Sequence, residues 1–197
     1  DVSLLKSFTQ PCHLDVICGT QDGFPEVEAF RNVIRSVGVY SIEGTRLCTG
    51  SLINNSRRDC RPLFLTADHC GISESNASSV VVHWNYQNQT CRTPGSPENS
   101  AAGNGSLNEF TSGANLLASH RPTDFALIEL SEDLPPESNL YLAGWNNRVD
   151  NFDSTACIHH PSVEEMRISF DFDTLRIFED DESFWQVENW EIGSTER

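Results

Sequence analysis

The pentapeptide Thr66-Ala67-Asp68-His69-Cys70 constrains the fold of this chain more than any other feature. It ends an apolar run, 63–66, whose composition indicates a short buried strand. A second apolar run, 125–130, begins directly after Asp124, which lies 55 residues beyond His69. A carboxylate that holds one imidazole nitrogen leaves the other nitrogen able to take a proton. We therefore take His69 and Asp124 as the candidate catalytic residues.

The length and composition bound the class of protein. The 197 residues suit one domain, or one domain built from two barrels. No stretch of about 18 apolar residues occurs, so the sequence predicts no membrane span. The net charge of −16 argues against nucleic-acid binding, because phosphate backbones attract the opposite sign. Asp1 begins no signal-like pattern, so we expect a mature, processed form.

The cysteines indicate an oxidising compartment. Seven are present and none forms a Cys-x-x-Cys pair, which disfavours zinc-ribbon and thioredoxin folds. A secreted, extracellular protein with disulfide bonds fits better, and the odd count leaves at least one cysteine without a partner in this sequence. Four Asn-x-Ser/Thr sequons are compatible with secretion, although such short motifs also arise by chance. They begin at Asn54, Asn76, Asn88 and Asn104.

Two compositional features leave alternatives open. Acidic residues gather between Glu164 and Glu191, with the run 179–182 at the centre. A solvated loop is the favoured interpretation; a field that attracts cationic substrates and a Ca²⁺ site without EF-hand spacing are the others. Lys6 is the only lysine beside twelve arginines. This scarcity reflects either compositional drift or self-protection by an enzyme that cuts after lysine.

Short strands dominate the predicted structure. They carry β-branched and aromatic residues between turn signals, which favours an all-β barrel or sandwich. We expect a brief helical turn at 67–71 and long surface loops at 93–108 and 133–136. The predicted strands are 33–40, 47–53, 63–66, 80–86, 125–130, 140–145, 167–172 and 184–190.

Other chemistry-bearing residues receive structural interpretations. His159 and His160 are adjacent, and adjacent strand residues point to opposite faces, so they cannot easily ligate one ion together with His69. We expect them to be structural, and we predict no metal site and no cofactor. Asp68 is interpreted as a turn residue. Cys70, beside His69, suits a disulfide that holds the histidine turn, most simply to Cys48.

Runs along most of the chain resemble the lysyl endopeptidase branch of the trypsin-like serine proteases, which are secreted bacterial enzymes. The resemblance implies a chymotrypsin-like double β-barrel and cleavage of peptide bonds after a basic residue. It also implies that His69 and Asp124 belong to a His-Asp-Ser triad, with protein or peptide substrates. The matching runs are 48–55 (CTGSLINN), 64–70 (FLTADHC), 83–86 (HWNY), 123–130 (TDFALIEL), 143–145 (AGW) and 158–161 (IHHP).

The resemblance also implies domain limits and disulfide pairs. Residues 1–197 would form one incomplete protease domain, with the first barrel at about 1–110 and part of the second at about 111–197. The family pattern pairs Cys48 with Cys70 and Cys18 with Cys91, and it directs Cys12 to a cysteine in the C-terminal part. Cys60 and Cys157 remain, and we expect them to pair.

The nucleophile is where the sequence departs from the family. There, a segment like 190–196 runs into a Gly-Ser-Ser-Gly-Ser-Pro loop, whereas this sequence stops at Arg197. Ser51 occupies a structural position of the family, and Ser194 lacks the glycine that should follow. The oxyanion-hole amides, the acidic specificity residue and the last strands of the second barrel would be missing as well.

Three explanations fit this ending. The favoured one is a nicked enzyme, because a trypsin-like cut leaves a C-terminal arginine; the other fragment would carry the serine and could be tethered through Cys12. A shortened sequence is the second explanation. The third is a natural protein without the nucleophile.

The sequence therefore predicts a secreted serine endopeptidase that cuts after a basic residue, with lysine favoured and arginine possible. The alternative is a non-catalytic protease homologue that binds proteins through the same loops. A cysteine- or metal-dependent hydrolase is weakly supported, since the cysteines have disulfide roles and no zinc-type histidine spacing occurs.

Overall fold

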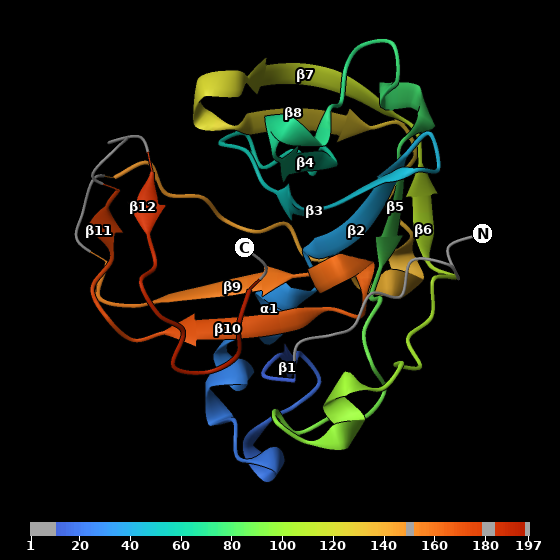
Figure 1. The fold of residues 1–197 in the computed structure, drawn as a ribbon. Helices are drawn as coiled ribbons and strands as arrows, with labels where there is room; N and C mark the ends of the chain where they lie inside the picture. The colour runs from blue at the N-terminus through green and yellow to red at the C-terminus, as the bar shows by residue number, and fades with distance from the viewer. Residues whose placement is uncertain (1–10, 149–151, 179–183, 196–197) are drawn as a thin grey trace. The chain divides into compact units, whose positions relative to one another are not determined.

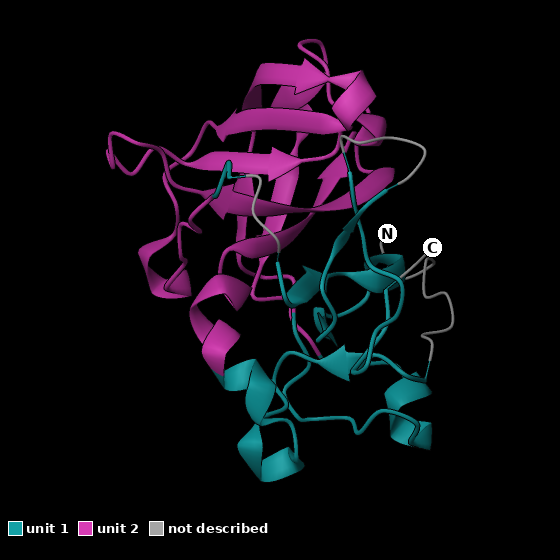
Figure 2. Ribbon diagram, turned by 90° about the vertical axis from the view of Figure 1, so that its left-hand side faces the viewer, with its two compact units in different colours: residues 1–28, 87–104, 146–197 teal, residues 29–86, 105–145 magenta. Residues whose placement is uncertain are grey.

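A computed structural model describes residues 11–148, 152–178 and 184–195 (Figure 1). These residues are mostly β-structure and include a single short α-helix, α1 (Arg31–Ile34). They fall into two compact units (Figure 2): unit 1 comprises 1–28, 87–104 and 146–197, and unit 2 comprises 29–86 and 105–145. The division expected near residue 110 differs from this one, because 105–145 complete the sheet of unit 2. Lys6, the acidic run 179–182 and Arg197 lie outside the described residues.

Unit 2 is built on one antiparallel sheet of seven strands. Its spatial order is β6-β5-β2-β3-β4-β8-β7. The strands are β2 (Val37–Ile42), β3 (Arg46–Ile53), β4 (Leu63–Thr66), β5 (Val81–Trp84), β6 (Phe110–Ser112), β7 (Ala114–His120) and β8 (Phe125–Leu130).

The sheet of unit 2 curls until its two ends meet. β6 and β7 are the outermost strands of the order, yet only Gly113 separates them in the chain. The Gly113 N–H donates to Val80 O at 2.7 Å, and Gly113 O accepts from Ser131 N at 3.0 Å. Gly113 has φ +77°, a conformation that costs glycine little. One bent segment thus joins both edges, which gives the expected chymotrypsin-like barrel.

The barrel interior is apolar. In β8, buried and partly exposed residues alternate, as expected for a strand with one face on a core. The ring of Phe64 packs edge-on against Tyr40 and Trp84, with centroids 5.7 and 5.8 Å away. Beside it, β3 has Gly50, where an added Cβ would overlap the Phe64 ring. The core includes Tyr40, Ile42, Leu52, Phe64, Val80, Val82, Trp84 and Ile128, each essentially inaccessible to solvent.

Unit 1 has less sheet. β1 (Leu14–Asp15), β10 (Arg167–Asp171) and β9 (Thr155–His159) form an antiparallel sheet in that order. A short ladder joins β11 (Arg176–Ile177) to β12 (Trp185–Gln186). The Cys18–Cys91 disulfide links the N-terminal segment to the 87–104 segment within this unit.

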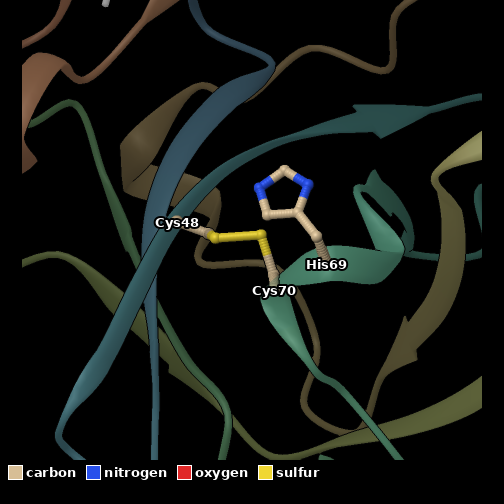
Figure 3. A group of neighbouring side chains, drawn as sticks. All are labelled: Cys48, His69 and Cys70. Carbon is tan, nitrogen blue, oxygen red and sulfur yellow. A yellow bond between two sulfur atoms is a disulfide. The ribbon is translucent and has the colours of Figure 1, made fainter. Parts of the chain in front are cut away.

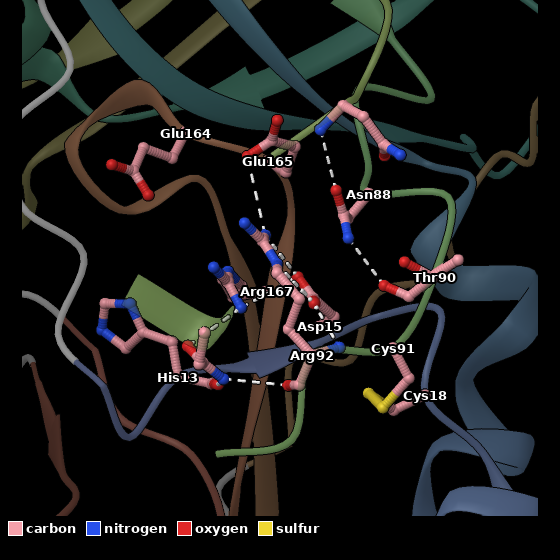
Figure 4. A network of polar contacts seen from close by, with 12 residues as sticks. His13, Asp15, Cys18, Asn88, Thr90, Cys91, Arg92, Glu164, Glu165 and Arg167 are labelled. Carbon is pink, nitrogen blue, oxygen red and sulfur yellow. Dashed lines mark hydrogen bonds and ion pairs between the residues drawn. A yellow bond between two sulfur atoms is a disulfide. The ribbon is translucent and has the colours of Figure 1, made fainter. Parts of the chain in front are cut away.

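Charged side chains are buried in unit 1 (Figure 4). Arg92 donates to both carboxylate oxygens of Asp15, at 2.8 and 2.9 Å. Arg167, fully inaccessible, lies 2.8 Å from the same carboxylate. Glu165 is 3.6 Å from Arg92. Two cations and two carboxylates therefore offset one another, as buried charges must. We call Asp15, Arg92, Glu165 and Arg167 the buried charge network.

The predicted all-β class is confirmed, although several strands were placed wrongly or missed. Segment 33–40 begins as α1 before β2, and 140–145 forms only a bridge between Ala143 and Ile53. β1, β6, β7, β9 and β11 were missed. Of the seven residues in β7, only Ala114 is buried, so the sequence has no apolar alternation to signal the strand.

Short 3₁₀ turns connect the strands. None of the helices in the described ranges is long and apolar enough to cross a membrane. The turns are Thr20–Asp22, Pro25–Phe30, Asp68–Cys70, Ala77–Ser79, Pro97–Ser100, Arg121–Thr123, Pro136–Ser138 and Pro161–Val163.

Candidate active site

His69 lies in the 3₁₀ turn that follows β4 in unit 2. Gly71 ends the turn with φ +80°, in the left-handed region that glycine favours. The Asn76 side-chain amide donates to Gly71 O at 3.0 Å, and Arg46 Nη1 donates to the same oxygen at 3.3 Å. Asp68 opens the turn, and its carbonyl accepts from Gly71 N at 2.9 Å, which fits the expected turn role.

Two consecutive residues of β3 hold the histidine turn on both sides. On one side, the Thr66 hydroxyl donates to Thr49 O at 2.9 Å. On the other side, Cys70 forms a disulfide with Cys48 (Figure 3). The buried Tyr40 hydroxyl lies 2.9 Å from Thr66 Oγ1 and donates to it, because the Thr66 proton is already used. Burial raises the pKa of Tyr40 to about 12, against the opposing effect of the Thr66 hydrogen bond. Our sequence analysis missed this support from Tyr40 and Thr49.

The pairing of β4 with β8 explains how residues 55 positions apart meet. The strands are antiparallel, with Thr66 opposite Ala126. The chain therefore leaves β4 toward His69 at the same end of the sheet where it enters β8 from Asp124. Asp124 has φ 48°, a left-handed conformation that aspartate tolerates better than most residues.

Asp124 binds His69 through both carboxylate oxygens. Oδ1 accepts the backbone N–H of His69 at 2.8 Å, and Oδ2 lies 2.6 Å from Nδ1. A carboxylate at Nδ1 favours the tautomer that has its proton there, so Nε2 is left as a base. Burial alone would raise the pKa of Asp124, but the hydrogen bonds from His69 outweigh it and hold that pKa below its ordinary value.

The imidazole is open to solvent. The His69 side chain is 71% exposed and that of Asp124 is 37% exposed. The pair can therefore accept a proton from a group that approaches from outside. The two serines near family motifs have local contacts: Ser51 Oγ lies 2.9 Å from Ser36 Oγ, and Ser194 Oγ donates weakly to Thr195 O at 3.3 Å.

His159 and His160 each contact a backbone carbonyl oxygen. His159 Nε2 lies 3.0 Å from Ser194 O, and His160 Nδ1 lies 2.8 Å from Glu164 O. Burial, reinforced for His159 by the nearby charge of His13, lowers both pKa values to about 4. Both contacts fit structural roles. Cys48, His69 and Cys70 cluster closely, but the two sulfurs are bonded to each other and cannot act as thiolate ligands.

The cysteines divide into two bonded pairs and three free thiols among the described residues. Cys48–Cys70 and Cys18–Cys91 are the pairs that the resemblance implies. The structure does not contain the expected bond between Cys60 and Cys157: Cys60 is free and exposed, and Cys157 is free and half-buried on β9. Burial raises the pKa of the Cys157 thiol to about 11, so this thiol stays protonated. Cys12 is exposed and free.

Comparison with known proteins shows the family of this chain. Residues 8–197 match the family model described as lysyl endopeptidase, C-terminal domain. The chain belongs to the lysyl endopeptidase family. The lysyl endopeptidase of Pseudomonas aeruginosa (strain PAO1) is 30% identical over 161 residues, which cover 80% of this chain. The resemblance expected from the sequence is thus confirmed.

The chain spans about a third of the length of that relative, 33%. Among solved structures, two inactive forms of the protease Rv3671c from M. tuberculosis are similar to this family member. Their TM-scores are 0.43 and 0.41, with 14% sequence identity in both cases. Each match covers 74% of this chain, and 52% or 54% of the mycobacterial chain.

Proposed function

We propose that this chain is part of a serine endopeptidase that cleaves peptide bonds after a basic residue, with lysine favoured over arginine. The observation that carries the proposal is the double contact of Asp124 with the His69 backbone and ring. Membership of the lysyl endopeptidase family supports lysine as the preferred residue. In this proposal the serine is supplied by sequence beyond residue 197, in a second fragment of a nicked enzyme.

The proposed chemistry uses His69 twice. Nε2 takes the proton from the serine hydroxyl as its oxygen attacks the scissile carbonyl carbon, and the resulting imidazolium gives this proton to the leaving amine. A water molecule then repeats the sequence on the acyl-enzyme, so the peptide bond is hydrolysed. Asp124 keeps the Nδ1 proton in place and stabilises the imidazolium. These steps require no cofactor.

The partners follow from this chemistry. Protein or peptide chains are the substrates, and the C-terminal fragment is the structural partner. Cys12 is exposed with a free thiol, so it is available as the tether to that fragment. Two disulfides support an oxidising, extracellular location.

Catalysis is tested on the uncut gene product with two matched aspartates. Asp124→Asn should lower kcat by about 10⁴, because the altered side chain favours the wrong histidine tautomer. Asp68→Asn, one residue before His69, should retain activity because Asp68 is a turn residue. Cleavage of peptides with lysine or arginine before the scissile bond measures the preference.

A serine-directed phosphonate separates the enzyme from a protein-binding homologue. Covalent labelling of a peptide that lies beyond residue 197 supports the proposal. A correctly folded protein that neither reacts with the phosphonate nor cleaves any basic peptide would refute it. Intact masses before and after disulfide reduction show whether a second fragment is held through Cys12.

A further inference from the structure

The four sequons of this chain lie in very different surroundings. An N-linked glycan is joined to the side-chain nitrogen Nδ2 of asparagine, so the native fold must leave that nitrogen and the space beyond it free. The structure describes all four asparagines and separates them by burial and by the use of Nδ2. The four are Asn54, Asn76, Asn88 and Asn104.

Two of the asparagines are part of the folded interior. Asn76 is 9% exposed, and its Nδ2 donates to Gly71 O at the end of the histidine turn. Asn88 is 4% exposed; its Nδ2 donates to Thr90 O at 2.7 Å, and its Oδ1 accepts from Asn104 N at 2.8 Å (Figure 4). A sugar at either nitrogen would have no room in the native fold, because each asparagine is buried and its Nδ2 lies against a backbone oxygen.

Asn104 is arranged differently. Asn104 is exposed, and its side-chain oxygen is engaged in a hydrogen bond: Oδ1 accepts from Gln89 N at 2.9 Å. That contact fixes the plane of the side-chain amide, so Nδ2 of Asn104 points away from Gln89 N. The hydroxyl residue of the sequon, Ser106, is exposed as well. Asn54 is intermediate, because it is half-buried and lines a cavity of about 220 Å³ with Arg58 and Cys60.

We propose that Asn104 is an N-glycosylation site and that Asn76 and Asn88 stay unmodified in the folded protein. The donor class is an oligosaccharide linked to a lipid diphosphate. Nδ2 of Asn104 forms the bond to the anomeric carbon, the bond from that carbon to the diphosphate breaks, and the amide loses one proton.

The test uses the uncut gene product, secreted from a eukaryotic host. Glycans are released with peptide N-glycosidase in heavy-oxygen water, so each formerly glycosylated asparagine becomes a labelled aspartate. Spontaneous deamidation at Asn104-Gly105 before this step remains unlabelled. We expect the label at Asn104, less of it at Asn54, and none at Asn76 or Asn88. No label at Asn104, or label at either buried asparagine in folded protein, overturns the proposal.

Matched variants remove single sequons without changing an asparagine. Ser106→Ala should abolish the glycan at Asn104, whereas Thr90→Ala should leave the glycoprotein mass unchanged apart from the substitution.

A second measurement needs no glycosylating host. In protein made in bacteria, Asn88→Gln should lower the urea midpoint of unfolding more than Asn104→Gln does, and the opposite ranking would contradict the assigned surroundings.

Discussion

The interiors of the two units of this chain differ in composition. Unit 2 buries an almost wholly apolar set of side chains inside a sheet that closes on itself, and its ion pairs, such as Arg61 with Glu129, remain accessible. Unit 1 has a short sheet and buries Asp15, Arg92 and Arg167. Buried charges stabilise only while every partner is present, whereas an apolar core tolerates more change.

This difference also bears on the candidate site. In unit 2, the pair of His69 and Asp124 is exposed beside an apolar barrel core, so its chemistry is separate from the interactions that hold the fold. In unit 1, charged groups are themselves the interior. We therefore expect substitutions of charged residues to change activity in unit 2 and stability in unit 1.

The largest expected effect on stability comes from the buried charge network. Asp15→Asn removes the carboxylate that both arginines contact, and loss of one partner from a buried ion pair costs about 3–5 kcal/mol. Glu129→Gln in unit 2 is the matched control. Glu129 also makes two hydrogen bonds to one arginine, but in an accessible place, so the change should be small. Urea unfolding measures both; equal losses would remove the contrast between the units.

We expect the disulfide in unit 1 to contribute more to stability than the disulfide in unit 2. Cys18–Cys91 spans 73 residues and Cys48–Cys70 spans 22. Loop-closure entropy then gives about 4.4 kcal/mol for the bond in unit 1 and about 3.4 kcal/mol for the bond in unit 2. Each pair is replaced by alanines, and unfolding is followed by hydrogen exchange of peptides from each unit. A larger loss for the shorter loop would show that chain entropy does not govern these bonds.

Acid should weaken unit 1 first. His159 and His160 have folded-state pKa values of about 4, below the ordinary 6.5, so the unfolded chain binds more protons between these values. Stability is thus complete above pH 6.5 and falls as the pH drops toward 4, by about 3 kcal/mol for each histidine. Comparing urea midpoints at pH 7 and pH 5 tests this.

The double variant His159→Gln/His160→Gln isolates the cause. Its midpoint should change less between pH 7 and pH 5 than that of the unaltered protein. An unchanged pH difference would assign the acid sensitivity to other groups.

The smallest expected effect on stability concerns the buried hydroxyls of Tyr40 and Thr66, which support the histidine turn. Tyr40→Phe removes a donor but leaves Thr66 bonded to Thr49 O, so we expect a loss of about 1 kcal/mol. Thr66→Val leaves the buried Tyr40 hydroxyl without its partner, which costs about 1–3 kcal/mol. Equilibrium unfolding ranks the two; a greater loss for Tyr40→Phe would argue against the assigned donor direction.

The parts that sequence analysis predicted are those with a strong local pattern. β3, β4 and β8 have apolar alternation or short apolar runs, and the turn at Asp68–Cys70 has a distinctive motif. β7 could not be predicted, because its exposed face and bulge near Leu116 obscure the alternation. Residues 33–40 show the opposite error, because a strand was predicted where the segment begins as a helix. An apolar run of that length suits either structure.

The sequence alone determined the family, the candidate pair His69 and Asp124, and the absence of any long apolar span, because each depends on residue identity or order along the chain. Only the tertiary structure showed the barrel closing at Gly113, the hydrogen bond from Thr66 to Thr49 that holds the histidine turn, and the buried charge network. These features join residues far apart in the chain. Whether Asp15 meets Arg92 and Arg167 depends on packing that brings three separate segments together, and no local pattern encodes that meeting.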